Sequence, residues 1–172
     1  MEPSVMHDKT FKYVPFVTEV MTARRPKLSE PDMEGDYADG KYKTEATASD
    51  DYTQRFQQEI QTFIGLNFAD TKNMYVPWKE TKEGAIAFIF ASPKKQPELV
   101  DAKGNALKQG IIIRDGSLIR IAGVIVAWEK GMKRGVSLWP DAVRVIKLAM
   151  GFAAAFGPPE EGFDGTCHFE PR

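Results

Sequence analysis

The segment from residue 117 to residue 147 constrains the fold more than any other part of the chain. Its first part, SLIRIAGVIVAWE (117–129), places Ile119, Ile121 and Ile125 on one face, and this alternation predicts a long, half-buried strand. Gly123 stands in the middle of that strand, where a glycine indicates a bulge or a sharp bend. A basic loop, EKGMKRG, then leads into a last strand that we expect to break near Pro140 and Asp141.

The rest of the chain supplies shorter strands and one helix. We expect a first strand over about 16–23, a second over 41–48, a helix that Asp50 or Asp51 caps, and a strand over 85–92. The helix carries an apolar stripe of Tyr52, Phe56, Ile60, Phe63 and Ile64. The stretch NMYVPWKETKEG is expected to be irregular, and Lys103-Gly104 to form a turn.

The predicted order is strand, strand, helix, strand, strand, strand. A parallel α/β sheet would need a helix between successive strands, so this order favours a small closed sheet. The fold class predicted is therefore an all-β-dominated β-barrel with one main α-helix, a five-stranded OB-like Greek-key barrel.

Net charge hides an uneven distribution of acids and bases. The whole chain of 172 residues has a formal charge of −1, yet residues 28–51 hold eight acids against two lysines. The final sixteen residues are also acidic, so the remainder of the chain is basic. A basic body with acidic appendages is compatible with a polyanionic partner.

Aromatic rings alternate with cations at several places, which is the combination that binding of single-stranded nucleic acid requires. Cations follow the phosphates, and flat rings stack on bases of any sequence. The predicted nucleic-acid-binding residues are Lys41, Tyr42, Lys43, Trp78, Lys79, Arg120, Trp128, Lys133, Arg134 and Trp139. The alternative is that each tryptophan packs on the core and that Lys130, Lys133 and Arg134 merely keep a hairpin soluble.

Catalysis and metal binding find little support. One cysteine, Cys167, and two histidines, His7 and His168, cannot form a conventional zinc site or an internal disulfide. The acidic loop DMEGDYADG has Tyr37 and Lys43 where a calcium loop needs glycine and glutamate. We predict no catalytic residue, no metal and no cofactor. Two alternatives stay open: a metal-dependent nuclease that uses the acids of this loop, and a protein-interaction module that uses exposed tryptophans.

The distal half resembles the phage single-stranded-DNA-binding proteins with an OB fold. The resemblance rests on LVDAKGNAL, GSLIRIAGVIVAW and RGVSLWPDAVRVIKL in this order, with GKYKTEATA upstream, and it covers about residues 11–150. It implies a non-catalytic protein that coats and protects single-stranded DNA in phage replication and recombination. It also implies an acidic tail with an aromatic end that contacts replication proteins, whereas this chain ends in Arg172.

These patterns give a domain division and a set of partners. We expect a DNA-binding domain over 1–156 and a flexible, mildly acidic tail over 157–172. The expected partners are single-stranded DNA, replication proteins reached through the tail, and a second copy of the chain in a homo-oligomer. The N-terminus does not resemble a secretion signal and no run of about 18 apolar residues occurs, so we expect a cytoplasmic protein with no membrane partner.

Overall fold

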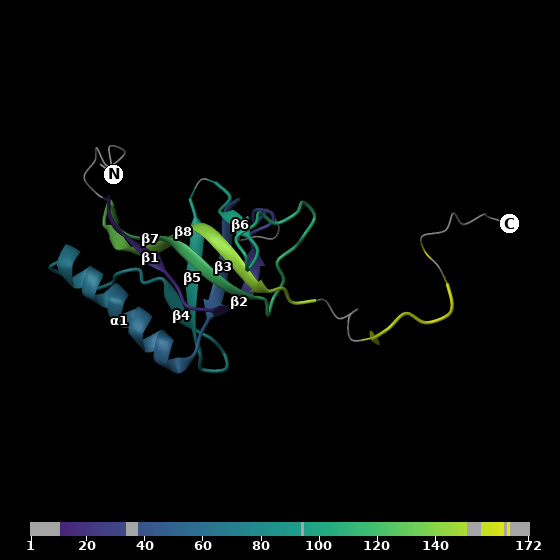
Figure 1. Cartoon of the computed structure of the whole chain (residues 1–172). Coiled ribbons are helices and arrows are strands. Elements are labelled where there is room, and N and C mark those ends of the chain that lie inside the picture. Colours follow the sequence, from purple (N-terminus) through teal and green to yellow (C-terminus); the bar gives the residue numbers. More distant parts are fainter. Residues whose placement is uncertain (1–10, 34–37, 94, 151–155, 164, 166–172) are drawn as a thin grey trace.

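A computed structural model describes residues 11–33, 38–93, 95–150, 156–163 and 165 of the chain. One helix, α1 (Asp50–Asn67), lies beside a highly curved sheet (Figure 1). The strands are β1 (Phe11–Val17), β2 (Met21–Lys27), β3 (Tyr42–Thr47), β4 (Trp78–Glu80), β5 (Ile86–Ser92), β6 (Glu98–Val100), β7 (Leu118–Lys130) and β8 (Lys133–Lys147). Within the described residues, no helix has the length and hydrophobicity needed to traverse a bilayer.

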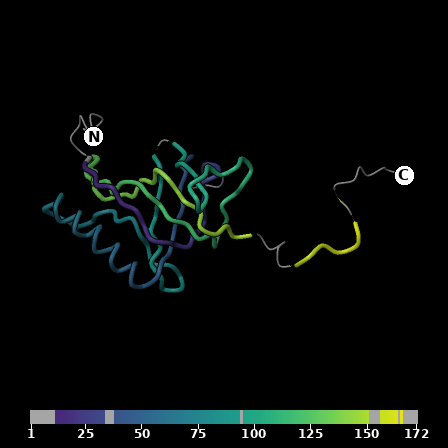
Figure 2. Tube along the Cα trace, viewed as in Figure 1, coloured from purple at the N-terminus to yellow at the C-terminus, as the bar shows by residue number. Residues whose placement is uncertain are grey.

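The strands close into a ring. β2 pairs with β3, β3 with β5, β5 with β8, β8 with β7, and β7 returns to β2. All these pairings are antiparallel except the parallel contact between β5 and β8. β1 precedes β2 along the same edge of β7. Figure 2 shows β1 in purple beside the green trace of β7 and β8, in agreement with its pairing with β7. The predicted OB-like closed sheet is thus confirmed, with β4 and β6 as short additions.

The core lies inside the ring and under the helix. Ile119, Ile121 and Ile125 are fully buried, as the alternation of the long strand predicts. Phe56 of α1 contacts Phe88 with ring centroids 4.9 Å apart and Phe16 with centroids 5.8 Å apart. Burial of one such ring stabilises a fold by about 1.5–3 kcal/mol, so the apolar stripe of α1 holds the helix against the barrel.

Four local expectations need correction. The predicted first strand over 16–23 is divided between β1, which ends at Val17, and β2, which begins at Met21. At Thr18 the N–H still donates to the carbonyl of Ile121, but the Thr18 hydroxyl accepts the N–H of Ile121. Ser49, rather than Asp50 or Asp51, caps α1, since its side chain accepts the N–H of Tyr52. Part of the segment expected to be irregular forms β4, which pairs with β5.

The last strand is continuous rather than broken at Pro140 and Asp141. The pairing of β7 with β8 slips at that point, because Ala122 faces Ala142 while Gly123 faces Pro140. The bulge therefore places Gly123 against the backbone of β8, where an added Cβ would lie 1.9 Å from the carbonyl oxygen of Trp139. The glycine serves the close approach of two strands, in agreement with the bulge that its position predicts.

Candidate nucleic-acid interface

A shallow groove of about 300 Å³ lies on the outer face of the barrel, over β3, β5, β7 and β8. We call it the aromatic groove. Its walls include Asp39, Lys41, Lys43, Tyr75, Ile89, Ala91, Pro93, Trp128, Ser137, Leu138 and Trp139. The groove thus brings together four of the ten predicted residues: Lys41, Lys43, Trp128 and Trp139.

Strand alternation explains why these residues share one surface. On β7 the isoleucines point inward, so Val124 and Trp128 lie on the opposite face. Trp139 pairs with Val124, and Gly135 pairs with Trp128, so that face continues onto β8. On β3 the buried residues are Thr44 and Ala46, which leaves Lys43 on the outer side.

The rings in the groove are held in place. The indole N–H of Trp128 donates to the hydroxyl of Ser137 at 2.9 Å. The ring of Tyr75 lies against Trp128, with centroids 6.3 Å apart and an interplanar angle of 39°. Tyr75 is nevertheless 42% exposed, and the burial of the remainder of its side chain raises its pKa above the ordinary value. A half-exposed ring supported on one side is suited to stacking on its free side.

The cations in the groove differ in their partners. Lys43 forms ion pairs with Asp32 at 2.8 Å and with Asp39 at 3.1 Å. Burial alone would lower the pKa of Lys43, but the two carboxylates outweigh it, and the pKa lies above the ordinary value. Lys41 is exposed and has no ion pair among the described residues. Lys41 can therefore bind an external anion directly, whereas Lys43 can bind an anion only if that anion displaces a carboxylate.

Two predicted rings lie outside the groove. Trp78 is half-buried and makes an edge-on contact with Phe88 of the core, with ring centroids 6.1 Å apart. Tyr42 shares the face of β3 that carries the buried Thr44 and Ala46, opposite the face of Lys43. A role for either ring in binding stays a prediction.

Four predicted cations also lie outside the groove. Lys79 pairs with Glu45 at 2.7 Å, and Arg134 pairs with Asp70 at 3.1 Å and donates to the carbonyl of Lys72. Lys133 is exposed at the tip of the β7–β8 hairpin, opposite Lys130. Arg120 lines a separate pocket further along the hairpin.

Tyr75 is a groove residue that the predicted set omits. It lies in a segment without strand periodicity, and its placement depends on a bridge to Gly135, sixty positions later. A Cβ on Gly135 would lie 2.6 Å from the Cβ of Tyr75 and 3.0 Å from the ring of Trp128. The glycine inside an otherwise regular strand was the available signal, since it marks a close approach of another segment.

The acids near the groove act as ion-pair partners. Asp32 and Asp39 both bond to Lys43, and the backbone closes their loop through Asp32 N–H to Lys41 C=O at 2.9 Å. Among the described residues no three histidine, cysteine or acidic side chains cluster in a way that could hold a metal ion. Glu34, Asp36, Tyr37, His7, Cys167 and His168 lie outside the described residues.

Comparison with solved structures identifies the fold. The gp2.5 single-stranded DNA binding protein of bacteriophage T7 superposes with a TM-score of 0.64 at 20% sequence identity, over 86% of this chain and 98% of that one. The barrel has the fold of phage single-stranded-DNA-binding proteins. The single-stranded DNA-binding protein of bacteriophage Enc34, in complex with ssDNA, superposes with a TM-score of 0.63 at 16% identity, over 80% of this chain and 89% of that one.

Sequence comparison adds no relative. No protein-family model matches the chain, and no curated protein sequence matches it. The likeness is therefore one of three-dimensional structure.

Proposed function

We propose that this protein binds single-stranded DNA with little sequence preference, by stacking bases on aromatic rings and neutralising phosphates. The observation that carries the proposal is the aromatic groove, where Trp128, Trp139 and Tyr75 lie beside Lys41 and Lys43 on one outer face of the barrel. Stacking on such rings contributes about 1–3 kcal/mol per base and is available only to bases that are not paired in a duplex.

The structural neighbours support binding of single-stranded DNA. The proteins from bacteriophages T7 and Enc34 are both single-stranded-DNA-binding proteins, and the latter is known in complex with ssDNA. An OB barrel places its ligand on the outer face of its central strands, and β3 and β5 form part of the groove here. A non-catalytic binder is compatible with this arrangement, in which Asp39 of the groove and the nearby Asp32 are both engaged in ion pairs with Lys43.

The biological setting follows as part of the proposal. A protein of this kind would coat and protect single strands during phage DNA replication and recombination, in the cytoplasm of the host cell. Replication proteins would be its partners through the acidic tail, in which Glu160, Glu161 and Phe163 are exposed. Self-association along a bound strand is a further element of this proposal.

The test is a titration of intrinsic tryptophan fluorescence with oligo-dT at low and at raised salt. We expect saturable quenching, and an affinity that falls with salt by a log–log slope of about 0.7 for each phosphate neutralised. Trp128→Phe and Trp139→Phe should each remove part of the quenching, whereas Trp78→Phe should leave most of it, because Trp78 packs on Phe88.

Three other results would contradict the proposal. Absence of quenching and of DNA retention at low salt would favour a protein-interaction surface. Cleavage of the oligonucleotide in Mg²⁺ would favour a nuclease. Equal binding of duplex and single strands would show that the rings do not stack on unpaired bases.

A further inference from the structure

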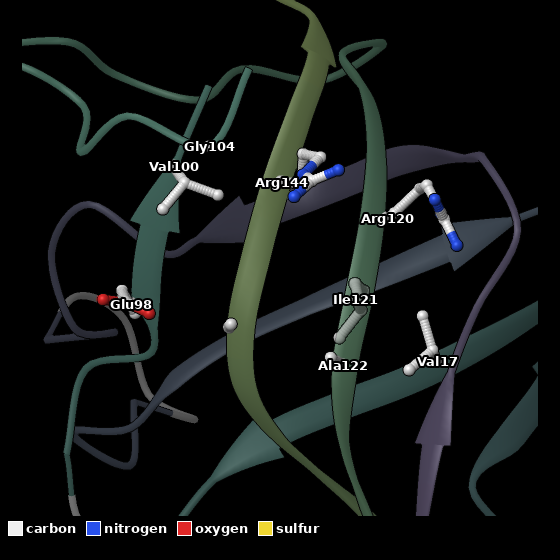
Figure 3. Close-up of a pocket in the computed structure, with 9 residues that line it drawn as sticks. Val17, Glu98, Val100, Gly104, Arg120, Ile121, Ala122 and Arg144 are labelled. Atoms are coloured by element: carbon white, nitrogen blue, oxygen red, sulfur yellow. The ribbon is translucent and has the colours of Figure 1, made fainter. Parts of the chain in front are cut away.

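A second hollow, of about 350 Å³, lies further along the β7–β8 hairpin than the aromatic groove. Arg120 of β7 and Arg144 of β8 stand directly opposite each other in this hollow. Figure 3 shows the two side chains on adjacent strands, with Glu98 and Val17 at the two sides of the hollow. We call Arg120 and Arg144 the arginine pair.

The arginine pair is distinctive because it places two like charges at directly paired positions of β7 and β8, in one hollow. Like charges directly opposite each other on paired strands destabilise a sheet. Arg24, Lys43, Lys79 and Arg134 of the barrel each have an acid within ion-pair distance, whereas other cations, such as the exposed Lys41, have none among the described residues. No ion pair joins Arg120 or Arg144 to an acid among the described residues, although Glu98 lines the same hollow.

Arg120 is held in position for an external anion. Its Nε donates to the backbone carbonyl of Thr18 at 2.9 Å, and its two terminal nitrogens form no hydrogen bond with any described residue. Thr18 is itself fixed, because its hydroxyl accepts the N–H of Ile121 and its own N–H donates to the carbonyl of Ile121. An oriented guanidinium is suited to two parallel hydrogen bonds with the oxygens of a phosphate.

The arginine pair lies on the same face of β7 as the aromatic groove. Arg120, Ala122, Val124 and Trp128 occupy alternate positions of one strand, and Trp139 of the groove pairs with Val124. At about 3.3 Å per residue, the pair lies about 13 Å along the strand from the position of Trp139. A single strand that leaves the groove along the hairpin therefore meets the pair next.

We propose that the arginine pair is a second phosphate-binding site, which binds the backbone of a DNA strand that is stacked in the aromatic groove. This inference rests on the proposed function. It extends the binding site along the hairpin and assigns to Arg144 a contact that the sequence pattern does not single out. An acidic peptide is the other anion that the pair could accept, and the experiment separates it from DNA.

The experiment compares Arg144→Gln with Arg114→Gln, which removes the same charge from an exposed arginine outside both hollows. Affinity is measured by tryptophan quenching for a dT trinucleotide and for an oligo-dT of about twelve nucleotides, within the usual range for an OB fold. For Arg144→Gln we expect an affinity for the long strand about three- to ten-fold lower, with a salt slope smaller by about 0.7. The affinity for the trinucleotide and the maximal quenching should stay as in the wild type.

A second variant should change the affinity for the long strand in the opposite direction. Glu98→Gln removes the acid that lines the hollow and should raise the affinity for the long strand. Equal behaviour of Arg144→Gln and Arg114→Gln, or equal losses for both oligonucleotide lengths, would overturn the second site while leaving the proposed function intact. Unchanged DNA binding with loss of binding to a poly-glutamate peptide would assign the pair to a protein partner. Failure of the wild type to bind either oligonucleotide would overturn the proposed function itself.

Discussion

Gly135 determines how closely the chain can bring two rings of the groove together. The backbone of Tyr75 bonds on both sides of this glycine, through Tyr75 N–H to Arg134 C=O and Val136 N–H to Tyr75 C=O, each 3.0 Å long. A side chain at position 135 would enter the space between Tyr75 and Trp128. The ring pair of the groove thus depends on a residue that has no side chain.

Gly135→Ala should lower both the stability of the barrel and the quenching by DNA. Its new methyl group would overlap Tyr75, and overpacking of this kind costs about 1–3 kcal/mol. Urea denaturation and oligo-dT titration measure the two effects. Gly65→Ala is the matched control, since nothing lies within 4 Å of its added Cβ and alanine is favoured in a helix. Unfolding at an unchanged urea concentration would show that Tyr75 moves aside at no cost.

At this scale the sequence predicts which residues are buried better than which rings meet. The isoleucines of β7 are readable because alternation is a local property. Trp78 and Trp128 look alike in sequence, each next to a lysine or an acid in a short apolar stretch. One packs on Phe88 and the other lines the groove, because their surroundings come from strands distant in sequence.

The segment that joins β2 to β3 brings acids to the edge of the groove. Asp39 bonds to the backbone N–H of Lys41 and to the ammonium of Lys43. Burial by itself would raise the pKa of Asp39, but these two bonds outweigh it, and the pKa lies below the ordinary 3.8. The carboxylate therefore occupies the position beside Lys43 that the proposed function assigns to a DNA phosphate.

Asp39→Asn should raise the affinity for DNA about two- to five-fold, because DNA then no longer has to displace the Asp39–Lys43 ion pair, and an exposed ion pair has an energy of this size. Because the pKa of Asp39 is lowered in the fold, its ion pair is complete above pH 3.8 and is lost only as the pH falls through the lower, folded value. The difference between variant and wild type should therefore be constant from about pH 5 to 8. Glu59→Gln, an exposed acid on α1, is the control. Weaker binding by Asp39→Asn would mean that the loop orders Lys43 for DNA.

Elements were predicted well where a pattern runs long enough. The alternation over β7 and the stripe on α1 extend over several periods, so their type and inward faces follow from the sequence. β4 has three residues, too few to show a period, and it forms because β5 offers a free edge. The continuity of β8 through Pro140 depends on the bulge opposite Gly123, which only pairing with β7 reveals.

The described part of the molecule consists of a closed barrel and, after residue 155, a short segment near the C-terminus. The described residues 156–163 are exposed, and no side-chain hydrogen bond joins them to the described part of the barrel. We propose, in line with the sequence pattern, that the folded domain ends near residue 156.

Removal of residues 157–172 should change the free energy of unfolding of the barrel by no more than about 0.5 kcal/mol, as for a surface change that breaks no contact. Differential scanning calorimetry measures this, and circular dichroism checks that strand content is kept. A marked fall in the unfolding temperature would place the terminal segment within the folded domain. If the acids of this segment compete with DNA, the truncated protein should also bind oligo-dT more tightly at low salt.

The pairing of the first strand with β7 has a consequence for biosynthesis. Every residue of β1 finds its partner more than a hundred positions later in the chain. At a translation rate of about 5–20 residues per second, β1 waits roughly 5–25 s for that partner. During this interval the ring partners of Phe16, Phe56 and Phe90, are translated, but the backbone N–H and C=O groups of β1 still have no partner strand. The barrel closes only after nearly the whole domain has been translated, and its non-local contacts favour folding on the millisecond-to-second timescale.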